Sequence, residues 1–201
     1  MLVATLTSGL TTDDPQQLAI KETLTKIAAF LKEDFHVYMP LLLTNLVNDA
    51  KLDIDIKLSS ADDDKPDTSS AFTIKMKGLE GNQRLSMNTS ALESKIAAFK
   101  LFNMISENMG TAFAPYVEPL LPIMMENVNY IYSRAVRKSA LKTLNNMLTA
   151  VGEPVNVAFF MNLYGTFTSL IAKCVEKQDL KEVKMILKQY WVMIKNLNDT
   201  N

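Results

Sequence analysis

Apolar residues recur at steps of three and four in four long segments, the spacing that places them on one face of an α-helix. The clearest segment is Ser133–Val151, for which Ser133 is a candidate N-cap and Gly152 a stop signal. The other amphipathic helices are predicted to begin at Asp14, Ser90 and Asp179. Only six glycines and seven prolines occur in 201 residues, so long helices are favoured.

Shorter and more apolar segments precede three of these helices, at residues 35–50, 113–130 and 155–177. The chain is therefore predicted to alternate apolar and amphipathic helices. The starts of the amphipathic helices are separated by about 76, 43 and 46 residues. The last two values match the period of about 40–47 residues of HEAT and armadillo repeats. The first separation, about 76 residues, exceeds this period, which indicates an insert.

Residues 51–89 interrupt the helical pattern. Apolar and polar residues alternate over Leu52–Leu58, a strand signature, and the acidic stretch SSADDDKPDTSS follows. Phe72–Lys77 and Gln83–Asn88 alternate again and predict a short β-hairpin. We thus divide the chain into three parts. They are HEAT repeats over 1–50 (a truncated first unit and the first helix of the second), the insert over 51–89, and further HEAT repeats over 90–201.

Composition narrows the possible functions. The formal net charge of −1 argues against a nucleic-acid binder, which usually carries a basic stripe. The single cysteine, Cys174, excludes an internal disulfide and fits a reducing compartment. No apolar run approaches the roughly 18 residues that a membrane span needs. We therefore expect a soluble intracellular protein with no membrane insertion and no direct contact with nucleic acid.

Enzymatic motifs are missing from the sequence. It has no Gly-rich phosphate loop, no HExxH and no nucleophile elbow. His36 is the only histidine, so a multi-histidine metal site is excluded, and a turn role is expected for it. We predict a protein that is not an enzyme and needs no cofactor or metal.

The segment SRAVRKSALKTLNNML, residues 133–148, has the pattern of a HEAT second helix. Three longer stretches, at residues 32–58, 62–95 and 113–141, carry a more specific order of apolar helix, strand, acid run, hairpin and helix. In this order the chain resembles the karyopherin-beta (importin-beta) superfamily, and within it the importin-5 branch.

The resemblance implies an all-α fold, an α-solenoid of about four HEAT repeats with an inserted acidic loop and short β-hairpin. It also implies a fragment of a nuclear transport receptor that shuttles between cytoplasm and nucleus. The implied partners are basic cargo proteins of the ribosomal or histone type, Ran-GTP and Phe-Gly nucleoporins. The alternative is a static HEAT scaffold of a multiprotein complex, without dependence on Ran.

Two groups of charged residues are candidate partner-binding sites. The acid run Asp62, Asp63 and Asp64, with Asp67, could contact basic cargo or Ran, or it could be a solvated loop without a partner.

The second group lies on the predicted helix 133–151. Arg134, Lys138 and Lys142 are four residues apart and share a face, which could meet an acidic partner. For Arg137 we expect a structural role, bridging neighbouring repeats through hydrogen bonds.

Overall fold

The computed structural model describes residues 16–52, 56–60, 70–74, 83–87, 89–152 and 155–199. The predicted helix start at Asp14 and the acid run 62–67 lie outside these residues. The described α-helices are α2 (Gln16–Leu31), α3 (Met39–Ala50), α4 (Thr89–Met109), α5 (Val117–Asn127), α6 (Arg134–Val151), α7 (Val155–Glu176) and α8 (Leu180–Asp199).

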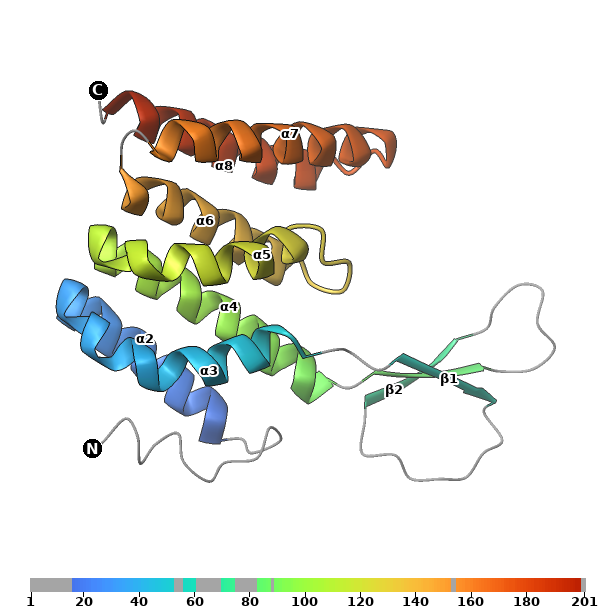
Figure 1. Cartoon of the computed structure of the whole chain (residues 1–201). Coiled ribbons are helices and arrows are strands. Elements are labelled where there is room, and N and C mark those ends of the chain that lie inside the picture. Colours follow the sequence, from blue (N-terminus) through green and yellow to red (C-terminus); the bar gives the residue numbers. More distant parts are fainter. Residues whose placement is uncertain are drawn as a thin grey trace.

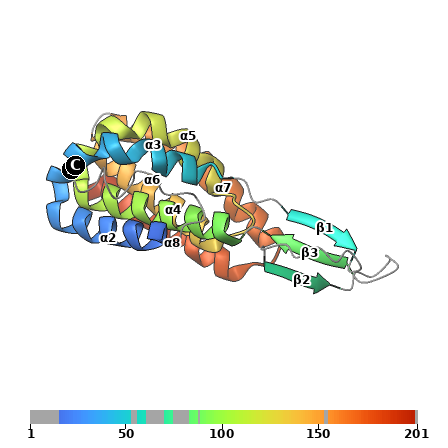
Figure 2. The ribbon, with the colours of Figure 1, turned by 90° about the horizontal axis from the view of Figure 1, so that it is seen from below.

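The helices stack in chain order from α2 to α8 and form an α-solenoid (Figure 1). Helices α2, α4, α6 and α8 pack side by side, each on the next, and we call them the second-helix layer. Helices α3, α5 and α7 pack against α4, α6 and α8 respectively, and we call them the first-helix layer. Figure 2 shows α3 and α5 along one side of the stack and α2 and α4 along the other. The predicted all-α repeat fold is confirmed.

Local sequence signals set the ends of the second helices. The Ser133 hydroxyl accepts a hydrogen bond from the Val136 N–H, so Ser133 is the N-cap of α6, as predicted. Asp179 caps α8 in the same way, since its carboxylate accepts from the Glu182 N–H at 3.0 Å. Helix α6 ends at Gly152, whose φ of 62° and ψ of 179° suit glycine alone.

Two first helices begin later than the apolar pattern predicts. Phe35 and Phe113 lie in 3₁₀ turns, η1 (Lys32–Tyr38) and η2 (Gly110–Tyr116), which lead into α3 and α5. Pro40 stands in the first turn of α3, and Pro115 stands inside η2. Proline has no N–H to donate to a carbonyl four residues earlier, so α-helical bonding starts only around these positions.

Three strands lie in the described part of the insert, where the sequence predicted one strand and a two-stranded hairpin. They are β1 (Ile56–Ser60), β2 (Ser70–Ile74) and β3 (Gln83–Met87), in the antiparallel order β1-β3-β2. Leu85 of β3 pairs with Leu58 on one side and with Phe72 on the other. Residues 56–58 of the alternating segment thus lie in a strand of the same sheet. A third strand stabilises an otherwise marginal hairpin. The sheet lies beyond one end of α3 and α4 (Figure 1).

The core fills the space between the two layers. Its largest side chains include Phe35, Phe99, Phe102, Phe113 and Phe167, each fully buried. Along α6 the predicted stripe residues Val136, Ala140, Leu144 and Met147 are also fully buried. None of the described helices is long and apolar enough to cross a membrane.

Candidate partner-binding groove

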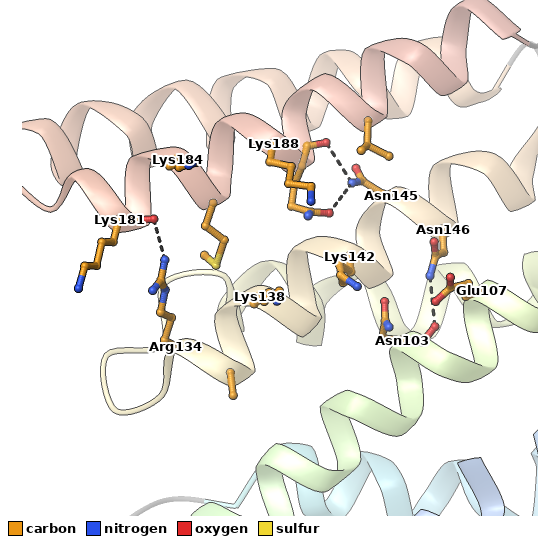
Figure 3. A pocket seen from close by; sticks show the side chains of 14 residues that line it. Asn103, Glu107, Arg134, Lys138, Lys142, Asn145, Asn146, Lys181, Lys184 and Lys188 are labelled. Atoms are coloured by element: carbon orange, nitrogen blue, oxygen red, sulfur yellow. Dashed lines mark hydrogen bonds between the residues drawn. The ribbon is translucent and has the colours of Figure 1, made fainter. Parts of the chain in front are cut away.

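An open furrow of about 680 Å³ runs between α6 and α8 on the second-helix layer, with α4 closing one end. Met185 and Val192 of α8 supply apolar surface, and Asn103, Asn145 and Asn146 supply amides. Six cationic side chains line it and are drawn in Figure 3: Arg134, Lys138, Lys142, Lys181, Lys184 and Lys188. We call this furrow the lysine groove.

A second open groove of about 760 Å³ lies beside it, over α2, α4 and α6. The two grooves share Asn103, Ala135, Lys138 and Lys142. The second groove has a mixed charge, because Glu22 and Glu93 stand among its lysines. Positive charge is therefore concentrated on the α6–α8 side.

The lysine groove collects the three cations that the sequence predicted to share a face. Lys138 and Lys142 come from α6 and lie opposite Lys184 and Lys188 of α8 (Figure 3). Among the residues that line the groove, Glu107 is the one carboxylate. The net charge of the groove is therefore strongly positive, although that of the whole chain is −1.

Sequence reasoning missed the contribution of α8. Lys181, Lys184 and Lys188 follow each other at steps of three and four, so they share one helix face. That spacing was visible in the sequence. Only the packing of α6 against α8, however, brings these three lysines beside Lys138 and Lys142.

Arg134 has a different position from the lysines. Its Nε lies 3.0 Å from Glu182 Oε2, and its Nη2 donates to the Lys181 carbonyl at 2.6 Å. Half of its side chain is exposed. Arg134 therefore fixes the start of α6 to the start of α8 and stands at the mouth of the groove.

Arg137 lies beneath, between the repeats. Its Nε donates to Glu182 Oε1 at 2.6 Å, and its Nη1 donates to the Tyr130 carbonyl at 2.8 Å. The hydrogen bond with Glu182 is the largest influence on the guanidinium and raises the pKa of Arg137, which partial burial opposes. The contact joins α6 to α8, and the bridging role of Arg137 between repeats stays a prediction.

Amide side chains join the second helices below the lysines. Asn146 Nδ2 donates to the Asn103 carbonyl at 3.2 Å and to Ser106 Oγ at 2.9 Å, which links α6 to α4. Asn145 Nδ2 donates to the carbonyl and to Oε1 of Gln189, at 3.0 and 3.1 Å, which links α6 to α8. Asn145 is 2% exposed, and its Oδ1 is buried without a hydrogen-bond partner.

Other residues singled out in the sequence lie away from the groove. Asp62, Asp63, Asp64 and Asp67 are outside the described residues. His36 is exposed in η1, with its Nδ1 2.9 Å from the Glu33 carbonyl oxygen, a local turn contact. Among the described residues, no three His, Cys, Asp or Glu side chains come together as they would to hold a metal ion.

Solved structures share this fold along nearly the whole chain. Kap121p bound to RanGTP aligns with a TM-score of 0.74 and 17% identity, over 98% of this chain and 19% of that one. Kap121p bound to Nup53p gives 0.73 and 18%, over 98% and 18%. Kap121p bound to Pho4p gives 0.72 and 18%, with the same coverage. No protein-family model matches the chain.

These similarities define the class of fold, a helical solenoid of the karyopherin type. The chain spans about a fifth of the length of the Kap121p chains that it matches. The identities are low, so the comparison concerns the backbone arrangement and leaves the surface chemistry to be argued from this chain's own residues.

Proposed function

We propose that this chain is a protein-binding segment of a nuclear transport receptor of the karyopherin-beta superfamily, nearest the importin-5 branch. One observation carries the proposal, namely that 98% of the chain aligns with Kap121p structures bound to RanGTP and to other proteins. Receptors of this kind move between cytoplasm and nucleus, and we propose the same localisation here.

The proposed partners follow from the neighbours and from the sequence. Kap121p has been solved with RanGTP, with Nup53p and with Ste12p. By analogy we propose Ran-GTP, Phe-Gly nucleoporins and cargo proteins as partners of this chain in its full-length context. Basic cargo is assigned to the acid run at Asp62, Asp63 and Asp64, since the described second-helix layer carries the opposite charge between α6 and α8.

A stacked-helix array gives such a receptor a physical means of release. Its repeats contact only their neighbours, so small changes at each interface add up to a change in curvature. Cargo and Ran-GTP that prefer different curvatures weaken each other's binding by their differential affinity for the two states. The bonds from Arg137 to Glu182 and from Asn146 to Asn103 lie at such interfaces.

The test is an affinity capture from cytosolic extract with the full-length protein as bait, with Ran locked in its GTP form or loaded with GDP. We expect basic proteins to be captured and then lost when Ran-GTP is added, while Ran-GDP leaves them bound. Capture of the basic proteins should weaken in an Asp62→Lys, Asp63→Lys, Asp64→Lys variant. Partners that stay bound whichever nucleotide Ran carries would overturn the proposal and favour the static scaffold.

A further inference from the structure

We propose that the lysine groove binds an extended, acidic segment of a partner protein, held through its Asp and Glu carboxylates. This inference stands apart from the transport proposal, because it rests on the charge and shape of the groove alone. It also concerns a ligand of the opposite sign from the basic cargo assigned to the acid run.

Charge is the first argument. Lys138, Lys142, Lys184 and Lys188 make no ion pair or side-chain hydrogen bond with any described residue, so their ammonium groups are available to a ligand. Glu107 is the one carboxylate in the lining. Like charges gathered in a cleft focus the local potential and attract an oppositely charged ligand. A face meant for solvent alone would more often interleave both signs, as the neighbouring groove with Glu22 and Glu93 does.

Shape is the second argument. The lining residues on α6 run from Arg134 to Asn146, which at 1.5 Å per residue gives a furrow about 18 Å long. An extended chain rises about 3.3 Å per residue, so about five residues fit along it. Alternate side chains then lie about 7 Å apart. Lys138 and Lys142, four residues apart on a helix, are separated by about 6 Å. Alternating carboxylates therefore match the lysine spacing.

The side chains that line the groove favour a peptide over a nucleic acid. No aromatic side chain lines this furrow, and single-stranded nucleic acids are usually held by stacking on aromatic rings. The one guanidinium, that of Arg134, already pairs with Glu182.

The experiment measures binding of a fluorescent peptide of about ten residues, alternating Glu with Ser and Gly, to the full chain by anisotropy. A peptide with Lys in place of Glu and a single-stranded oligonucleotide of equal charge serve as competing ligand classes. The groove variant is Lys138→Glu, Lys184→Glu, Lys188→Glu. The matched control is Lys173→Glu, Lys177→Glu, Lys195→Glu, which changes the net charge equally at exposed lysines outside both grooves. Circular dichroism verifies that both variants keep their helices.

We expect the groove variant to weaken binding of the acidic peptide by roughly tenfold or more, the sum expected for three exposed ion pairs. The control variant should stay within about twofold of the parent, and added salt should weaken binding by the parent. Equal losses in the two variants would show unspecific attraction and overturn the proposal. Tighter binding of the oligonucleotide than of the acidic peptide would also overturn it, by showing a polyanion site instead.

Discussion

Arg137 of α6 and Glu182 of α8 form an ion pair that joins two repeats through a deeply buried carboxylate. The side chain of Glu182 is 5% exposed, that of Arg137 is 19% exposed, and their Nε and Oε1 atoms are 2.6 Å apart. Arg134 approaches the other carboxylate oxygen, at 3.0 Å, from solvent. One buried carboxylate is thus held by two guanidinium groups with very different exposure.

This difference predicts unequal effects of two similar substitutions. Arg137→Gln leaves the buried carboxylate of Glu182 without its inner partner, and we expect a loss of about 3 kcal/mol in the free energy of unfolding. Arg134→Gln removes a half-exposed partner and should cost less than about 1 kcal/mol. Urea titrations followed by circular dichroism measure both. Equal losses in the free energy of unfolding would mean that both arginines stabilise the chain to the same extent, whatever their burial.

Leu144 tests the packing between layers. It is fully buried on α6, so Leu144→Ala removes contacts and leaves a cavity, with an expected loss of about 2–5 kcal/mol. Replacement by Asp should be worse, because the new charge has no partner there. Leu187→Ala, at a position on α8 that is 48% exposed, is the control and should change stability by less than about 0.5 kcal/mol. A loss below about 1 kcal/mol for Leu144→Ala would refute the assigned core.

Replacement by alanine is expected to have opposite effects on stability at two glycines. Gly152 has a φ of 62° and a ψ of 179°, which an alanine adopts only under strain, so Gly152→Ala should destabilise the chain by about 1–3 kcal/mol. Gly165 lies within α7, and a Cβ added there meets no other atom within 4 Å, so Gly165→Ala should stabilise the chain by about 0.5–1 kcal/mol. Thermal unfolding midpoints would show the two shifts directly. Shifts of the same sign would contradict this assignment of backbone strain.

The reactivity of Cys174 and the stability of the chain are expected to depend on pH through the Cys174 thiol. Desolvation by burial is the largest cause that raises the pKa of its thiol, and the carboxylates of Glu182 and Asp179 add to it. Iodoacetamide reacts with the thiolate, so alkylation near the ordinary thiol pKa should be slower in the folded chain than in urea. The unfolded chain loses the proton first, so the free energy of unfolding should fall as the pH rises from the ordinary thiol pKa to the raised one. A Cys174→Ser variant should lose that dependence.

The sequence predicted the second helices well because their signals are local. Ser133 and Gly152 mark the two ends of α6 through a side-chain cap and a special backbone angle, and both features act within a few residues. The repeat period was also readable. Hydrogen bonds between successive second helices join residues 43 to 47 positions apart, as at Asn146–Asn103, Arg137–Glu182 and Arg134–Lys181.

What the sequence could not supply depends on contacts between distant segments. Cys174 lies in an apolar stretch of the sequence but is only partly buried. Met161 lies in the same stretch and is 64% exposed, since α7 presents that face to solvent. The sequence predicted only the α6 side of the lysine groove. The spacing of the lysines on α8 does not show which helix packs against them.

One internal similarity was overlooked. The segments DFHVYMP and AFAPYVEP both lead into a first helix and both place an aromatic pair three residues apart. The rings of Phe35 and Tyr38 are 5.8 Å apart, and so are those of Phe113 and Tyr116. In each pair the phenylalanine belongs to a 3₁₀ turn and is fully buried. The repeat is thus visible in the turns as well as in the helices.

The polar bonds between successive repeats described above all lie in the second-helix layer, from Asn146 to Asn103 and from Asn145 to Gln189. In the first-helix layer, α3 and α5 touch much less than α2 and α4 do. The stack is therefore joined more tightly through its second helices than through its first helices. A change of curvature should accordingly widen the spacing of the first helices more than the spacing of α6 and α8, which carry the lysine groove.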